Sequence, residues 1–149
     1  MYTEHEYVEK ARALNKNGYN CAQAVACAFL DLVDVDEKTL FAILEGFGGG
    51  MGGKEATCGA VSGAVAILSL LASKGPVPSE IKAETYASVA PIVSAFLLQN
   101  KSLVCKDLRG LETGVVLRAC DLCIEDAVRF AVKEIEDREY YILEDSYGN

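Results

Sequence analysis

The sequence predicts an all-α protein: one domain over residues 1–149, a bundle of about six helices with a glycine-rich loop between the third and fourth. Three observations support this prediction. Apolar residues recur every three to four positions along most of the chain, and no stretch alternates as a strand would. Six glycines lie within the eight residues 46–53, which is too many for a regular helix or strand. At 51% hydrophobic residues, the chain can bury a sizeable core.

The first half of the chain carries clear helix-start signals. Thr3 with Glu6 forms a capping box, and Asn20 with Gln23 repeats this pattern after the Asn-Gly pair that ends the first helix. Asp36 supplies the next cap. These signals predict helices over residues 3–15, 20–33 and 37–45.

The second half is expected to be helical as well. Helices are predicted over residues 57–74, 79–99 and 113–137, with a short helical turn at residues 105–108. Pro91 should kink the second of these helices or split it near Ala90, because proline cannot donate the helical hydrogen bond. Residues 140–149 form an acidic, tyrosine-rich tail, which we expect to be loose.

Charge and hydropathy exclude several classes of partner. The net charge is −8 and no run of Lys or Arg is present, so nucleic acids and anionic membrane surfaces are excluded. The strongly apolar segment 64–72 is too short to cross a membrane. The acidic N-terminal residues do not resemble a secretory signal, which predicts a cytoplasmic protein. The high apolar content predicts a homodimer.

With one histidine and no tryptophan, the six cysteines are the main chemical resource. In a reducing compartment cysteines serve metals, redox chemistry or packing. Cys21 follows the cap Asn20, where helix N–H groups would stabilise a thiolate; simple packing is the equal alternative. Cys27 is interpreted as core filler. Cys58 stands between the glycine-rich loop and a helix, which favours a reactive or metal-ligating thiol.

The remaining cysteines allow more than one interpretation. Cys105 precedes Lys106, a nearby cation that would favour the thiolate. Cys120 and Cys123 form a CxxC motif inside a helix; no strand precedes it, so a thioredoxin fold is disfavoured, and two buried packing thiols are an equal alternative. A cysteine–histidine hydrolase would have to recruit His5, which is disfavoured.

The glycine spacing in the loop does not indicate a nucleotide site. The spacing of a Walker phosphate-binding loop is absent, and a dinucleotide site would need a preceding strand. Two chemistries remain for the cysteines: a thiol/disulfide relay, or ligation of an iron–sulfur cluster by four thiolates.

Three segments closely resemble the C_GCAxxG_C_C family of redox-active proteins: NCAQAV (residues 20–25), GFGGGMG (46–52) and TCGAVSGA (57–64). The resemblance extends over residues 18–128. It implies that the four characteristic family positions are Cys21, Cys58, Cys105 and Cys120. Cys27 and Cys123 fall outside the family pattern, which supports a packing role for both. A related module occurs joined to haem-carrying sequence in some anaerobes, which favours electron transfer, although this chain has no CxxCH motif.

We therefore expect a redox protein in which the four family cysteines converge on one site. In one form they ligate a [2Fe–2S] or similar cluster, and the loop and the helix start contribute Gly48, Gly49, Gly50, Gly59 and Gly63 around it. In the other form the protein is a dithiol oxidoreductase with Cys58 as the attacking thiolate. The sequence does not identify the redox partner. A non-catalytic helical module that binds a small ligand or a partner helix at the glycines is the rival hypothesis.

Overall fold

The computed structural model describes residues 1–76 and 82–142, and within them the protein contains α-helices and no strands. This confirms the all-α prediction. The described residues form seven α-helices: α1 (Glu4–Lys16), α2 (Cys21–Cys27), α3 (Glu37–Glu45), α4 (Gly59–Ala72), α5 (Lys82–Asn100), α6 (Cys105–Arg109) and α7 (Cys120–Asp137). Two 3-10 turns, η1 (Leu30–Leu32) and η4 (Tyr140–Ile142), and a π-helical turn, η2 (Gly50–Lys54), accompany them.

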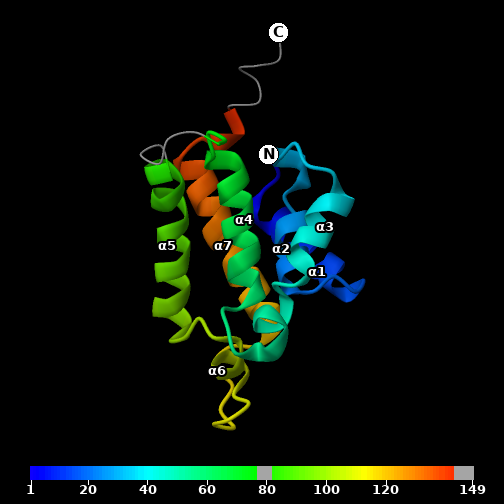
Figure 1. Cartoon of the computed structure of the whole chain (residues 1–149), viewed down its shortest axis with the longest axis vertical. Coiled ribbons are helices and arrows are strands. Elements are labelled where there is room, and N and C mark those ends of the chain that lie inside the picture. The colour runs from blue at the N-terminus through cyan, green and yellow to red at the C-terminus, as the bar shows by residue number, and fades with distance from the viewer. Residues whose placement is uncertain (77–81, 143–149) are drawn as a thin grey trace.

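Helix α4 lies at the centre of the bundle and packs against α2, α5 and α7. Helix α1 covers α2 and α7 from the outside, and α3 packs on α2. One continuous apolar cluster joins α1, α2, α3, α4, α5 and α7. Helices α2, α4 and α7 all begin at the end of the bundle where the short α6 lies (Figure 1). The starts of these helices are therefore close in space although they are far apart in sequence.

The predicted helix caps are present. Thr3 and Glu6 exchange bonds of 3.2 and 2.8 Å at the start of α1. Asn20 and Gln23 do the same at the start of α2, with both bonds 3.0 Å long. The carboxylate of Asp36 accepts the Thr39 N–H of α3 at 3.0 Å. Because each cap satisfies exposed N–H groups with a nearby side chain, its position is fixed by local sequence.

Two predicted helix boundaries are wrong. The second helix ends at Cys27 rather than near residue 33, because Phe29 leaves helical geometry and the chain continues as the 3-10 turn η1. The last helix begins at Cys120 rather than Thr113. Gly114 has a left-handed φ of 76°, which interrupts any helix through this segment.

Other expectations have mixed outcomes. Helix α5 runs through Pro91 without a split, and its expected start at residue 79 lies outside the described residues. In η2 the φ angles of Met51 and Gly52 are 61° and 88°, so the loop contains no regular helix, as predicted. Tyr140 is buried in the 3-10 turn η4, so the tail is packed at its start, and residues 143–149 lie outside the described part. No described helix combines the length and apolarity needed to span a membrane.

Candidate functional site

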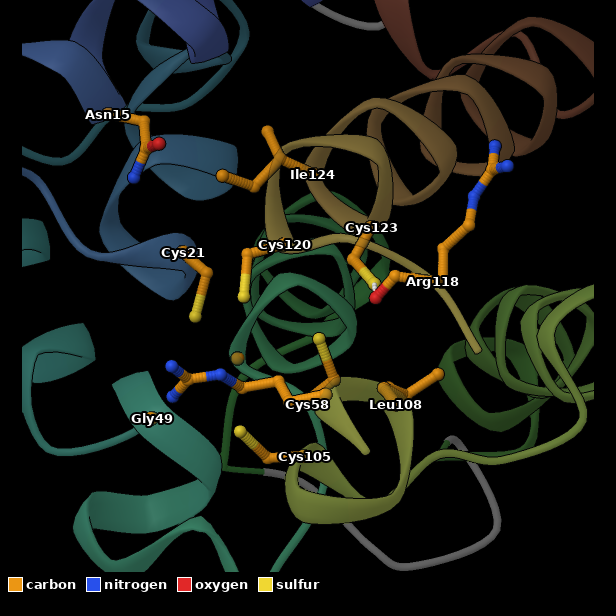
Figure 2. A pocket seen from close by; sticks show the side chains of 12 residues that line it. Asn15, Cys21, Gly49, Cys58, Cys105, Leu108, Arg118, Cys120, Cys123 and Ile124 are labelled. Carbon is orange, nitrogen blue, oxygen red and sulfur yellow. Dashed lines mark hydrogen bonds between the residues drawn. The ribbon is translucent and has the colours of Figure 1, made fainter. Parts of the chain in front are cut away.

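Five cysteines line one cavity of about 200 Å³ at the end of the bundle where α6 lies (Figure 2). They are Cys21, Cys58, Cys105, Cys120 and Cys123. The structure thus brings the four predicted site cysteines to a common cavity and adds Cys123, which sequence reasoning had left as a packing residue. Figure 2 shows the sulfur atoms of Cys21, Cys58 and Cys120 turned toward a shared space.

The four predicted site cysteines meet because each of them stands at the start of a helix. Cys21, Cys105 and Cys120 are the first residues of α2, α6 and α7, and Cys58 is the N-cap residue of α4. Since these helices begin at the same end of the bundle, their first residues surround one space. In the longer helices α4 and α7, the unpaired N–H groups of the first turn also favour negative charge nearby.

A short main-chain ladder fixes two of the cysteines relative to each other. An isolated antiparallel bridge pairs Thr57 with Val104. The Cys58 N–H donates to the carbonyl oxygen of Leu103 at 2.7 Å. The Cys105 N–H donates to the carbonyl oxygen of Ala56 at 2.9 Å. Backbone bonds therefore hold the Cys58 and Cys105 segments side by side.

Two glycines make room for the sulfur atoms. A Cβ at Gly59 would overlap the Cys21 sulfur and lie 2.9 Å from the carbonyl oxygen of Phe47. Gly50 has a φ of 59°, and a Cβ there would lie 2.5 Å from the Cβ of Cys105. Any larger residue would displace one of these thiols, so both glycines are required by close approach.

The other predicted glycines differ in their surroundings. Gly49 lines the cavity, and its backbone N–H group lowers the pKa of Cys21 against the larger effect of burial. Gly48 instead lies against the side chain of Asn20, and Gly63 lies against the backbone of α2. Gly48 and Gly63 thus face protein atoms, while Gly49 lies at the cavity.

Cys58 has the most reactive setting of these thiols. The pKa of Cys58 is lowered chiefly by a hydrogen bond with the Cys123 thiol, with further bonds from the backbone N–H groups of Ala60 and Val61. These bonds outweigh burial and the charge of Asp126, both of which raise the pKa. The same hydrogen bond, together with burial, raises the pKa of Cys123. Cys58 is therefore the thiol of this pair that ionises more readily.

A buried polar network positions Cys123. Its thiol lies 3.8 Å from the carbonyl oxygen of Arg118, to which it donates (Figure 2). The Arg118 guanidinium donates two bonds, of 3.0 and 2.9 Å, to the carboxylate of Asp126. Asn100 of α5 donates a third bond to the same carboxylate at 3.1 Å. This network ties the segment before α7 to α5 and so fixes the side of the cavity that carries Cys123.

Burial dominates at Cys21 and Cys27. The pKa of Cys21 is raised, because burial outweighs the hydrogen bonds from Gly49 and Ala22. Burial therefore acts against the thiolate, which is one of the two interpretations of Cys21. Cys27 packs in the apolar core, where burial raises its pKa to about 11. Its surroundings fit the packing role inferred from the sequence.

The cation expected beside Cys105 is a different residue from the one predicted. The Lys106 ammonium binds Glu55 at 2.8 Å and Glu112 at 3.2 Å, so its charge is already paired. Arg109 is the cation that lowers the pKa of Cys105, and it also lines the cavity. Burial is the larger effect and leaves the pKa of Cys105 raised.

The cavity suits some metal groups and not others. Within residues 1–76 and 82–142, no three His, Cys, Asp or Glu side chains are placed to hold one metal ion. An iron–sulfur cluster is larger than a single ion and takes four thiolates. The donor chemistry of Cys21, Cys58, Cys105 and Cys120 fits such a cluster, and the Gly49 N–H bond to sulfur is the kind of contact that tunes one.

The fold and the cavity define a helical protein whose cysteines gather at one end of the bundle. A family model described as "Putative redox-active protein (C_GCAxxG_C_C)" matches residues 19–134. The chain belongs to this family. No curated protein and no solved structure matches the chain.

Three cavity residues with ionisable side chains are absent from the predicted site: Cys123, Arg109 and Arg118. A signal for Cys123 is present in the sequence, because CxxC spacing places it on the same helix face as Cys120. The family pattern does not include this position, and it therefore favours a packing role for Cys123. The two arginines belong to no motif in the sequence.

Proposed function

We propose that the protein is a thiol/disulfide oxidoreductase in which Cys58 attacks and Cys123 resolves. The observation that carries the proposal is that both thiols line one cavity, where the Arg118 carbonyl oxygen holds the Cys123 thiol. The neighbouring Cys123 thiol also lowers the pKa of Cys58. A thiolate is the reactive form of cysteine, and a second thiol within hydrogen-bonding reach is the partner that completes exchange. Membership of a redox-active family is consistent with this chemistry.

The reaction balances without a further reagent. The Cys58 thiolate attacks one sulfur of a substrate disulfide, forms a mixed disulfide and releases the first substrate thiolate. Cys123 then attacks the Cys58 sulfur, forms the Cys58–Cys123 disulfide and releases the second substrate thiolate. The two protein sulfur atoms are oxidised and the substrate disulfide is reduced. Cys123 gives its proton to a released thiolate as it attacks, and the other released thiolate takes from water the proton that Cys58 lost when it ionised. The Arg118 carbonyl holds the Cys123 thiol beside Cys58 before the exchange.

Two substitutions of one residue test the assignment. Cys123→Ser keeps a hydrogen-bond donor beside Cys58 but removes the resolving sulfur, whereas Cys123→Ala removes both. We expect Cys123→Ser to retain rapid alkylation of Cys58 at neutral pH and to stop at the mixed disulfide. Cys123→Ala should slow the alkylation about tenfold, since a hydrogen bond to a charged group contributes roughly 1.5 kcal/mol. Peptide mass spectrometry on the reduced protein measures both quantities.

Cys27→Ala is the matched control, because Cys27 is buried in the core away from the cavity. It should leave both the alkylation rate and the disulfide unchanged. Equal alkylation of Cys58 in the two Cys123 variants would refute the role of the hydrogen bond. A disulfide in the wild-type protein that excludes Cys58 would refute the proposal as a whole.

An iron–sulfur site for electron transfer is the second candidate. It is favoured by the four family cysteines that start four different helices around one cavity. In this case Cys21, Cys58, Cys105 and Cys120 would hold the cluster, which when bound supplies one-electron transfer. Gly49 would hydrogen-bond to a ligand sulfur and the surrounding apolar residues would limit access of water.

Iron and acid-labile sulfide measured on anaerobically purified protein, with its visible spectrum, distinguish the two candidates. Matching iron and sulfide that are lost in Cys120→Ala but kept in Cys123→Ala would establish the cluster. A metal-free, colourless protein that forms the Cys58–Cys123 disulfide would establish thiol exchange.

A further inference from the structure

We propose that the cavity accepts a small disulfide bearing a carboxylate, and that Arg109 binds this carboxylate while Cys58 attacks the disulfide. The proposal rests on the thiol/disulfide function proposed above and names the substrate class of that site. Two independent properties of the cavity support it: the depth of the reacting sulfur atoms and the charge of the lining.

The reacting sulfur atoms are recessed. Cys58 is 7% exposed and Cys123 is 2% exposed, whereas Cys120 is exposed. The cavity holds about 200 Å³, which is below the usual size of drug-binding pockets. A disulfide embedded in a folded protein brings its surrounding chain with it and cannot reach this depth. A disulfide of a few heavy atoms can enter.

The charge of the lining favours an anion. The cavity is lined by two arginines and by no Asp or Glu, although the whole chain carries a net charge of −8. Arg118 is already bound to the carboxylate of Asp126. Among the ion pairs of the described residues none involves Arg109.

Arg109 also lies close to the sulfur atoms. It lies one helical turn after Cys105 on α6, and both residues line the same cavity as Cys58. A guanidinium presents a planar set of N–H donors that matches a carboxylate and does not exchange protons near neutral pH. It would therefore orient a carboxylate-bearing substrate without competing for the protons of the exchange.

Three small disulfides that differ in charge test the proposal: dithiodipropionate, which carries two carboxylates, neutral hydroxyethyl disulfide and cationic cystamine. The rate of Cys58–Cys123 disulfide formation in the reduced full chain is measured for each. Each rate is divided by that of the same disulfide with a free small thiol, which removes intrinsic reactivity. We expect the dicarboxylate to react fastest on this scale.

Arg109→Gln should slow the dicarboxylate about tenfold and leave the neutral disulfide unchanged, because a charge-assisted hydrogen bond is lost only with the first. Arg129→Gln is the matched control. It makes the same change in net charge on α7, at a residue that pairs with Glu4 and Glu125 and does not line the cavity. Equal melting temperatures of the two variants exclude a folding defect.

The outcomes separate the two proposals. If the wild type forms the Cys58–Cys123 disulfide equally fast with all three reagents, or if Arg109→Gln slows them equally, the substrate class is wrong and the thiol/disulfide function stands. If a folded protein disulfide reacts as fast as the dicarboxylate, the size argument is wrong. If none of the reagents yields the Cys58–Cys123 disulfide, the proposed function itself fails.

Discussion

The carboxylate of Asp126 binds Arg118, which lines the cavity, so a substitution of Asp126 tests the network beside the cavity. It is 3% exposed and accepts two hydrogen bonds from Arg118 and one from Asn100. Asp126→Asn preserves the shape of the side chain but replaces an accepting oxygen with an NH₂ donor. Both carboxylate oxygens accept from the guanidinium, so in either orientation of the amide this donor faces Arg118, and at least one favourable contact becomes a clash of donors.

The expected loss of stability follows from the exposure of the two partners. Breaking a fully buried ion pair costs about 3–5 kcal/mol. The Arg118 side chain is 31% exposed, so water screens part of the effect. We therefore expect a loss of about 2 kcal/mol, since an exposed pair contributes far less than a buried one. For a chain of this length that loss lowers Tm by about 4–8 °C.

Thermal unfolding followed by circular dichroism under reducing conditions measures this loss, and alkylation of Cys58 provides a second readout. The charge of Asp126 raises the pKa of Cys58. Its removal should lower this pKa, so the midpoint of the pH profile of Cys58 alkylation should move to lower pH. The midpoint is the quantity to compare, because the rate at a single pH also depends on the nucleophilicity of the thiolate, which falls with its pKa.

Asp137→Asn is the control, because Asp137 forms an exposed i,i+4 pair with Lys133 on the same helix. It should change Tm little. An Asp126→Asn variant with the Tm of this control would refute the contribution of the network to stability. An alkylation midpoint of Cys58 that is unchanged or moves to higher pH in that variant would refute the electrostatic argument.

Two further substitutions test the packing around the site and in the core. Gly59→Ala should lower the free energy of unfolding in urea by about 1–3 kcal/mol, because the added methyl group would overlap the Cys21 sulfur. Gly53→Ala is the control, since a methyl group there meets no neighbouring atom. Equal losses in the two variants would contradict this prediction. Burial and a 2.6 Å hydrogen bond to Asp31 raise the pKa of Tyr7. The protonated Tyr7 therefore contributes to the free energy of unfolding below its unfolded pKa of about 10, and this contribution is lost as the pH rises through the pKa of Tyr7 in the folded protein. The difference in urea stability between the wild type and Tyr7→Phe should shrink at alkaline pH.

The sequence was sufficient for features that depend on neighbouring residues. The caps at Thr3, Asn20 and Asp36 were located correctly because a capping side chain bonds to N–H groups two or three residues away. The same locality explains the glycine-rich loop, where backbone conformation alone excludes a regular helix. The family motif then identified four cysteines that the structure brings to one cavity.

Features that depend on tertiary contacts could not be predicted. The side of α7 that faces the cavity is set by packing against α4 and by the bond from Asn100 to Asp126, and it brings Cys123 beside Cys58. Arg109 reaches Cys105 because both lie on the short helix α6, whose place in the bundle the sequence does not reveal. The start of the last helix was misplaced because apolar Val115 and Val116 continue the helical pattern, although both are exposed.

The main-chain ladder around Thr57 and Val104 has a consequence for the behaviour of the whole molecule. In small zinc domains the thiols hold the fold, and loss of the metal unfolds the chain. Here the backbone carrying Cys58 and Cys105 is fastened by amide–carbonyl bonds in which sulfur takes no part. Oxidation of these thiols would leave the backbone bonds in place. We therefore expect the backbone around the cavity to keep its arrangement whichever oxidation state the sulfur atoms adopt.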